Sequence, residues 1–228
     1  EIMGEFAECI EGIKEACEFL NFPVVSGNVS FYNGTNKKNI YPTPVIGGVG
    51  LIKKLNKPMN HNFKYDNSSI IIVGKTFGHL ELSCFLRENF SIIDGRPPEI
   101  NILNEKNNGE MVLNLINKNL VCSAHDISSG GLLTALAEMS LGTEIGIKIE
   151  KPKQLANLNE YFFGEDQGRY ILEIERQNLD KIGKILKTND IYYENIGFTQ
   201  KKFFEIDKEM KIDTKDLFKA NNQWYNNY

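Results

Sequence analysis

The stretch VCSAHDISSGGLLTALAEMSL, residues 121–141, contains the strand-to-helix transition that decides the fold class. Residues 121–124 are predicted to form a short strand. The glycines at 130 and 131 then lead into a helix over 132–141, whose apolar residues recur at spacings of three and four. A strand that gives way to a helix through a short polar loop is typical of a domain that combines both element types.

The same alternation continues on both sides of this stretch. Further strands are predicted at 69–74 and 169–175 and around residues 196 and 204, and further helices at 79–89, 105–120, 179–187 and 217–224. Gly109 is expected to interrupt the helix over 105–120. The pattern predicts an α+β fold, α/β-like in its alternation, with a mixed sheet flanked by helices.

The first part of the chain has a different pattern. It predicts a helix over 5–20 that ends before Pro23, a short strand at Val24 and Val25, a hairpin with a turn at Asn33–Gly34, and a glycine-rich strand over 45–52. A polar segment rich in Asn and Lys follows, over 53–67. We take this segment as the domain boundary and divide the chain into residues 1–52 and 53–228.

Charge and composition exclude several classes of protein. The chain has 228 residues and a formal net charge of −4, and a dedicated nucleic-acid binder would usually have a basic stripe instead. No apolar run approaches the roughly 20 residues that are needed to cross a bilayer. The four cysteines form no C-x-x-C pair, which favours reduced thiols in a cytoplasmic protein. The chain begins at Glu1 without an initiator Met, and we expect it to be a piece of a longer polypeptide.

The first candidate site is the loop from Ser26 to Ser30. Gly27 would let a backbone N–H approach a phosphate closely, and Asn28 offers a neutral carbonyl oxygen that suits Mg²⁺. Ser30 lies two residues further on, on the same side of an extended segment, and can donate a hydrogen bond. The alternative is a turn that satisfies its own backbone, and for five residues taken alone this alternative is favoured.

Two more motifs have residues suited to binding. In the segment from Asp126 to Gly131, Ser128 is the predicted N-cap, the glycine N–H groups could bind an anion, and Asp126 could hold a metal or a ribose hydroxyl. A simple capped helix explains this segment equally well. The segment from Gly164 to Arg169 could form a polar cluster, although a surface turn with an Asp–Arg contact is favoured.

The three histidines, at positions 61, 79 and 125, are too dispersed for a metal triad, and we assign none of them a catalytic role.

Taken together, the motifs are more specific than they are singly. FPVVSGNVSFYN (residues 22–33), PTPVIGGVG (42–50), GRPPEI (95–100) and SAHD (123–126) resemble the signature of the phosphoribosylformylglycinamidine synthase family, subunit II type. GEDQGR (164–169) is similar to that family's Gly-Glu-Ser-Gln-Gly-Arg, with Asp166 in place of the serine. Ser129 stands where the family often has an acidic residue. The resemblance runs in order through nearly the whole chain.

This resemblance implies two pseudo-symmetric halves, each similar to aminoimidazole ribonucleotide synthetase. Residues 1–52 would end an N-terminal-type, ATP-binding domain, and 53–228 would form a complete C-terminal-type domain. The implied activity is the ATP-dependent amidation of formylglycinamide ribonucleotide to formylglycinamidine ribonucleotide in de novo purine biosynthesis, with ATP and Mg²⁺. The implied partners are a glutaminase subunit, a small bridging subunit and the N-terminal half of the same polypeptide, with no nucleic acid and no membrane.

The resemblance also implies residue roles. Gly27 would contact ATP, Asn28 would bind Mg²⁺ and Ser30 would contact the ribonucleotide. No catalytic residue is assigned within this chain, which we expect to be inactive alone, and the second and third motifs would line an auxiliary nucleotide site. The alternatives are another ATP-using enzyme of the superfamily, of the selenophosphate synthetase or thiamine-phosphate kinase type, and a non-catalytic nucleotide-binding scaffold.

Overall fold

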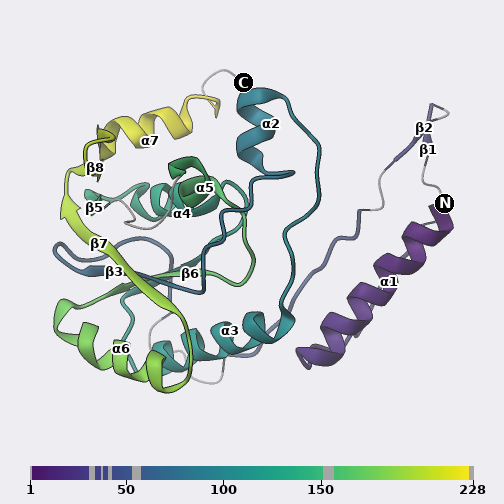
Figure 1. The fold of residues 1–228 in the computed structure, drawn as a ribbon, viewed down its shortest axis with the longest axis horizontal. Helices are drawn as coiled ribbons and strands as arrows, with labels where there is room; N and C mark the ends of the chain where they lie inside the picture. The colour runs from purple at the N-terminus through teal and green to yellow at the C-terminus, as the bar shows by residue number, and fades with distance from the viewer. Residues whose placement is uncertain are drawn as a thin grey trace. The chain divides into compact units, whose positions relative to one another are not determined.

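The computed structural model describes residues 2–30, 34–36, 38–40, 43–52, 58–150 and 157–225. The contacts divide the chain into two compact units, which we call unit 1 (Glu1–Asn56) and unit 2 (Lys57–Tyr228). Figure 1 shows unit 1 in purple and dark blue, and unit 2 from blue to yellow. The division falls inside the polar segment 53–67, while the boundary between residues 52 and 53 stays a prediction.

Unit 1 contains a helix and a small hairpin. Helix α1 (Ile2–Phe19) confirms the predicted N-terminal helix. Strands β1 (Gly34–Thr35) and β2 (Lys38–Asn39) pair in antiparallel fashion, so the predicted hairpin is present. Its turn contains Asn36, whose φ is 51°, instead of lying at Asn33–Gly34; Asn33 itself is outside the described residues.

Two strands that were predicted in unit 1 are wrong. The segments 22–30 and 43–52 contain no strand, and their aliphatic side chains are exposed, with Val25 at 93% and Val49 at 95%. A strand exists only where a neighbour accepts and donates its backbone hydrogen bonds. The described part of unit 1 pairs no strand with either segment, so their β-type composition alone does not produce one.

Unit 2 is built on one seven-stranded sheet with the order β4-β6-β3-β7-β5-β8-β9. Its strands are β3 (Ser69–Val73), β4 (Ser123–Asp126), β5 (Ile145–Ile149), β6 (Tyr170–Ile174), β7 (Tyr193–Lys201), β8 (Phe203–Ile206) and β9 (Met210–Asp213). β5 and β8 are parallel, whereas the other neighbours are antiparallel. The sheet is therefore mixed, which confirms the predicted fold class.

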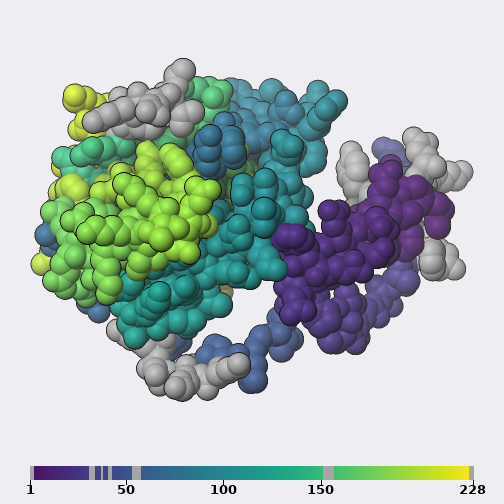
Figure 2. All heavy atoms as spheres, turned by 60° about the horizontal axis from the view of Figure 1, so that its bottom comes forward, coloured from purple at the N-terminus to yellow at the C-terminus, as the bar shows by residue number. Residues whose placement is uncertain are grey.

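Helices cover both faces of this sheet, as Figure 1 shows. They are α2 (Cys84–Phe90), α3 (Ile102–Asn117), α4 (Gly131–Ser140), α5 (Leu158–Phe163), α6 (Leu179–Thr188) and α7 (Thr214–Asn222), with a short 3₁₀ turn η1 (Arg176–Asn178). One core packs Leu136 of α4 and Phe162 of α5 against the sheet. The other packs Leu115 of α3 and Leu186 of α6 against the opposite face. The space-filling view of Figure 2 shows unit 2 as a closely packed body.

Two predicted helices in unit 2 differ from the structure. α3 runs without a break through Gly109, beside which the Tyr170 hydroxyl leaves little room for a side chain. The helix expected over 79–89 begins only at Cys84, where the Ser83 hydroxyl caps it. β5, α5 and β9 were not predicted, because short segments of this kind are defined by their neighbours in the sheet and core.

Candidate functional site

The fold brings the second and third motifs together. The segment 126–131 follows β4 and the segment 164–169 precedes β6, and these two strands are antiparallel neighbours with Asp126 opposite Tyr170. The end of one strand therefore lies beside the start of the other, and the segment 76–84 donates backbone hydrogen bonds to Glu165 and Asp166 of the third motif. We call residues 76–84, 126–131 and 164–169 the motif cluster.

Glu165 links two helices within the motif cluster. Its Oε1 accepts hydrogen bonds from the backbone N–H groups of Cys84 and Gly130, each at 2.8 Å. Cys84 is the first residue of α2, and Gly130 is the N-cap of α4, with a φ of 83°. The prediction that Ser128 is this N-cap is therefore wrong: the N-cap is Gly130, which has no side chain to cap the helix, and the Ser128 carbonyl oxygen accepts the Gly131 N–H at 3.0 Å.

Asp166 holds the loop before α2. Its Oδ2 accepts the N–H groups of Phe77 and Gly78, both at 2.9 Å, and its Oδ1 accepts the N–H of His79 at 3.1 Å. The backbone of residues 77–79 thus binds a carboxylate, and the helix that was predicted from residue 79 does not begin there. Asp166 is 4% exposed, so the carboxylate lies inside the protein.

Arg169 is the buried cation of the motif cluster and is only 1% exposed. Its guanidinium donates to the carbonyl oxygens of Gly164 (2.7 Å) and Asp166 (3.2 Å) and to the hydroxyl of Thr76 (3.1 Å). Burial lowers its pKa, and the nearby Asp166 carboxylate opposes that shift. The surface turn that was favoured for 164–169 is thus wrong, and the polar cluster is the arrangement present.

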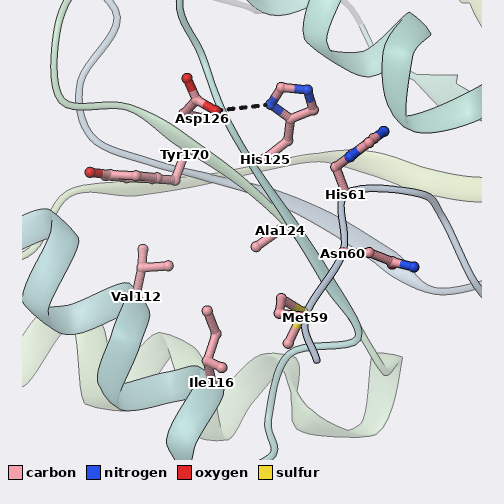
Figure 3. A pocket seen from close by; sticks show the side chains of 9 residues that line it. All are labelled: Met59, Asn60, His61, Val112, Ile116, Ala124, His125, Asp126 and Tyr170. Carbon is pink, nitrogen blue, oxygen red and sulfur yellow. Dashed lines mark ion pairs between the residues drawn. The ribbon is translucent and has the colours of Figure 1, made fainter. Parts of the chain in front are cut away.

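Asp126 lies apart from these hydrogen bonds, beside a hollow of about 440 Å³ at the edge of the sheet. Figure 3 shows its carboxylate next to His125, with 3.3 Å between the Asp126 Oδ1 and the His125 Nδ1. Met59 and Ile116 form part of the opposite wall. Among the described residues, no group of three His, Cys, Asp or Glu side chains is placed to hold a metal, so the predicted metal role of Asp126 stays a prediction.

Two of the histidines that looked dispersed in sequence are neighbours. The rings of His61 and His125 are 5.3 Å apart, and the His125 Nε2 lies 3.2 Å from the Glu138 Oε2. They meet because the segment around Asn60 runs along β4, where the Asn60 carbonyl accepts the Ala124 N–H. A long-range pairing of this kind leaves no local signal in the sequence.

A half-buried acid, Glu194, lies on β7. Tyr161 of α5 donates a hydrogen bond to Glu194 on β7, with 3.2 Å between the two oxygens. Burial raises the pKa of the Glu194 carboxyl, and the hydrogen bond from Tyr161 partly opposes this. The folded state therefore holds the proton more tightly than the unfolded chain. The resulting stabilisation is complete below the unfolded pKa of about 4.3 and is lost as the pH rises through the folded pKa.

Glu194→Gln is expected to remove this pH-dependent loss, because the amide stays neutral at every pH. The melting temperature of the variant relative to the wild-type chain should rise between about pH 4 and about pH 7.5. Thermal unfolding followed by circular dichroism at several pH values measures this difference. Glu110→Gln, at an exposed position on α3, is the control. If the difference in melting temperature between Glu194→Gln and the wild type does not change with pH, the raised pKa of Glu194 is contradicted.

The first motif lies in unit 1, on the segment 22–30, and is described on its own. Gly27, Asn28 and Ser30 are all exposed there. Nothing lies within 4 Å of the position that a Cβ on Gly27 would take, so the backbone at this point is open to a ligand. The roles assigned to these three residues stay predictions.

The fold and motifs define the class of protein. Residues 67–206 match the family model described as AIR synthase related protein, C-terminal domain, and residues 1–52 match the corresponding N-terminal domain. Because the first match alone covers more than half of the chain, the chain belongs to the AIR synthase related protein family. None of its described helices is long and apolar enough to span a membrane.

Within this family the chain is similar to phosphoribosylformylglycinamidine synthase subunit PurL. It is 47% identical to that of Pelagibacter ubique (strain HTCC1062) and 40% identical to that of Rhodopseudomonas palustris (strain BisB5), in both cases over 228 residues. These matches cover 100% of this chain and 31% of each relative. The chain thus spans about a third of the length of the curated relatives it matches. The resemblance inferred from the motifs is confirmed.

Solved structures support the fold. The structure of PurLQS from Thermotoga maritima has a TM-score of 0.55 at 18% identity and covers 70% of this chain and 27% of that chain. T. maritima PurL complexed with FGAR has a TM-score of 0.57 at 15% identity and covers 70% of this chain and 29% of that chain. At these identities the likeness concerns the fold alone.

Proposed function

We propose that this chain is part of an ATP-dependent enzyme that amidates formylglycinamide ribonucleotide to formylglycinamidine ribonucleotide. The observation that carries the proposal is the 47% identity with a PurL subunit along the whole chain, which includes the first loop and the motif cluster. Related PurL structures are complexed with ATP and with FGAR. These ligands fit a reaction in which ATP activates the oxygen of the glycinamide carbonyl.

The proposed reaction has two steps. The γ-phosphoryl group of ATP passes to the oxygen of the glycinamide carbonyl, the group that becomes the amidine, and ADP leaves. The nitrogen of ammonia then forms a bond to the carbon that carries this oxygen and gives up a proton. The C–O bond breaks, and phosphate leaves. The first step converts a poor oxygen leaving group into phosphate, so binding and orientation of both substrates are the main tasks of the protein.

The first loop fits this task. The Asn28 amide oxygen is a hard, neutral ligand that suits Mg²⁺ beside phosphate oxygens, and its exposure leaves it free to coordinate. Mg²⁺, when bound, supplies positive charge that offsets the charge of the transferred phosphoryl group. Gly27 would present its backbone N–H to ATP, because no side chain blocks the approach. Ser30 would donate its hydroxyl proton to the ribonucleotide.

Unit 1 would need further polypeptide to complete this site. Its two non-helical segments expose Val25, Val45, Val49 and Leu51 at 88–95%, an amount of aliphatic surface that domains normally cover. We propose that the N-terminal half of the same polypeptide covers these segments and supplies the strands they lack. Residues 1–52 would then end the ATP-binding domain, and residues 53–228 would form the C-terminal-type domain.

Ammonia would come from partner proteins. A related PurL is part of a PurLQS assembly, and we propose that this protein similarly works with a glutaminase subunit and a small bridging subunit. We also propose that the assembly is cytoplasmic. A glutaminase that delivers ammonia directly would prevent its protonation and loss in water.

The test is ADP release by the complete polypeptide with Mg²⁺, ATP, ammonia and formylglycinamide ribonucleotide. We expect release that depends on the ribonucleotide, and none from the 228-residue chain alone. Parallel reactions with selenide and with thiamine phosphate test the other superfamily activities. ADP release with either of these and not with the ribonucleotide would overturn the proposal. If none of the three substrates causes ADP release, a non-catalytic nucleotide-binding scaffold remains.

A further inference from the structure

The motif cluster contains backbone donors arranged as in phosphate-binding sites. The successive N–H groups of Phe77, Gly78 and His79 point to one carboxylate group, and Gly78 has the positive φ of 82° that allows this. Successive N–H groups in such a turn form a nest, a concavity that binds anions. We call these three residues the nest.

The nest already holds an anion that belongs to the chain. Both carboxylate oxygens of Asp166 accept its hydrogen bonds, at 2.9, 2.9 and 3.1 Å. The Arg169 Nη2 lies 3.7 Å from the Asp166 Oδ2, and its side chain is fully buried. Three N–H groups and a buried guanidinium are the surroundings that a phosphate group requires, and here a carboxylate occupies them.

A neighbouring pair of donors is filled in the same way. The N–H groups of Cys84 and Gly130, at the starts of α2 and α4, both point to the Glu165 carboxylate at 2.8 Å. Five backbone N–H groups of the motif cluster therefore point to either the Asp166 or the Glu165 carboxylate, and all five are satisfied from within the chain. An external phosphate would have to displace the Asp166 or the Glu165 carboxylate to reach any of them.

We infer that Asp166 is a built-in anion: it takes the place that a ligand's phosphate group would need, so the nest of this chain binds no external phosphate. This inference goes beyond the proposed function, because it concerns the second and third motifs and not the loop with Gly27. An auxiliary nucleotide could then not place a phosphate on the nest. Serine, which stands at this position in the motif that the chain resembles, is short and uncharged and would leave the nest open.

The test measures thermal unfolding of the 228-residue chain in inorganic phosphate and in chloride at matched ionic strength. The wild type should show no phosphate-specific change. Asp166→Ser should be less stable in chloride and should gain about 3–5 °C when phosphate is tenfold above its dissociation constant. Asp166→Asn is the matched variant: its side chain still fills the nest, and its melting temperature should not respond to phosphate.

Two further readouts make the outcome decisive. Backbone amide resonances of Phe77 to His79 should stay in place when phosphate is added to the wild type and should shift in Asp166→Ser. Asp180→Ser, at an exposed position on α6, controls for general effects of phosphate on a serine variant. The inference is overturned by phosphate-induced amide shifts in the wild type. It is equally overturned by an Asp166→Ser chain that folds without responding to phosphate, or that stays unfolded in its presence. None of these outcomes depends on the proposed reaction, because ATP and ribonucleotide are absent.

Discussion

Asn28→Ala in the complete polypeptide is expected to slow ribonucleotide-dependent ADP release by roughly 10²-fold or more, the effect of losing one preorganised stabilising group. The substitution removes the amide oxygen that we assign to Mg²⁺ and leaves a residue that any extended loop accepts. Asn28 lies exposed on the segment 22–30, so the unfolding temperature of the chain should change little. The loss should therefore appear as a change in rate and not as a loss of folded protein.

Steady-state ADP release at several Mg²⁺ concentrations measures this effect. If Asn28 holds the metal, extra Mg²⁺ should restore part of the rate of the variant. Asn39→Ala, at an exposed position in β2 of the same unit, is the matched control and should leave the rate unchanged. A wild-type rate for Asn28→Ala would remove this residue from the metal site.

Arg169→Met is expected to lower the free energy of unfolding of the chain by about 3–5 kcal/mol, because breaking a buried ion pair from one side leaves an uncompensated charge. Methionine has a similar length and fills most of the space. The Asp166 carboxylate, however, loses its buried cation, and the carbonyl of Gly164 loses a 2.7 Å hydrogen bond. The free energy of unfolding of Arg169→Lys should fall between those of the wild type and Arg169→Met, since lysine keeps the charge but not the planar fork of donors.

Urea unfolding of the 228-residue chain measures these losses. Arg176→Met is the matched control, because Arg176 follows the same strand, β6, but is exposed; its guanidinium over Phe198 contributes about 0.5–1 kcal/mol. The double variant Asp166→Asn/Arg169→Met should regain part of the loss, since it leaves no unpaired charge. Equal losses of unfolding free energy for Arg169→Met and Arg176→Met would show that the buried Asp166–Arg169 pair contributes no more to stability than the exposed Arg176.

Elements with a strong period were predicted correctly. α4 and α6 have apolar residues at helical spacing and capping or turn residues at their ends, and β3 is an apolar run between polar segments. Such signals are local, so they persist whatever the rest of the chain does. The helix α3 shows the limit of a local rule: Gly109 lowers helix propensity by about 1 kcal/mol, and the packing of Met111, Val112 and Leu115 in the core outweighs it.

The motifs were identified from sequence, but the burial and the hydrogen bonds of their residues were not predicted. Asp166 and Arg169 were expected in a surface turn, and the structure buries both. The five residues before Cys84 were expected to be helical, and three N–H groups of the loop that contains them bind Asp166 instead. Both results depend on contacts between residues more than 80 positions apart, which no local pattern encodes.

The sequence by itself determined the fold class, the family and the three motifs, because periodicity and short signatures are properties of neighbouring residues. Only the tertiary structure decided that the second and third motifs meet, that Glu165 and Asp166 accept the backbone N–H groups of Gly130 and of residues 77–79, and that His61 lies against His125. The physical reason is that strand pairing joins distant segments. Once β4 and β6 lie side by side, the segments at their ends meet, and polar groups that lose water there must find partners within the chain.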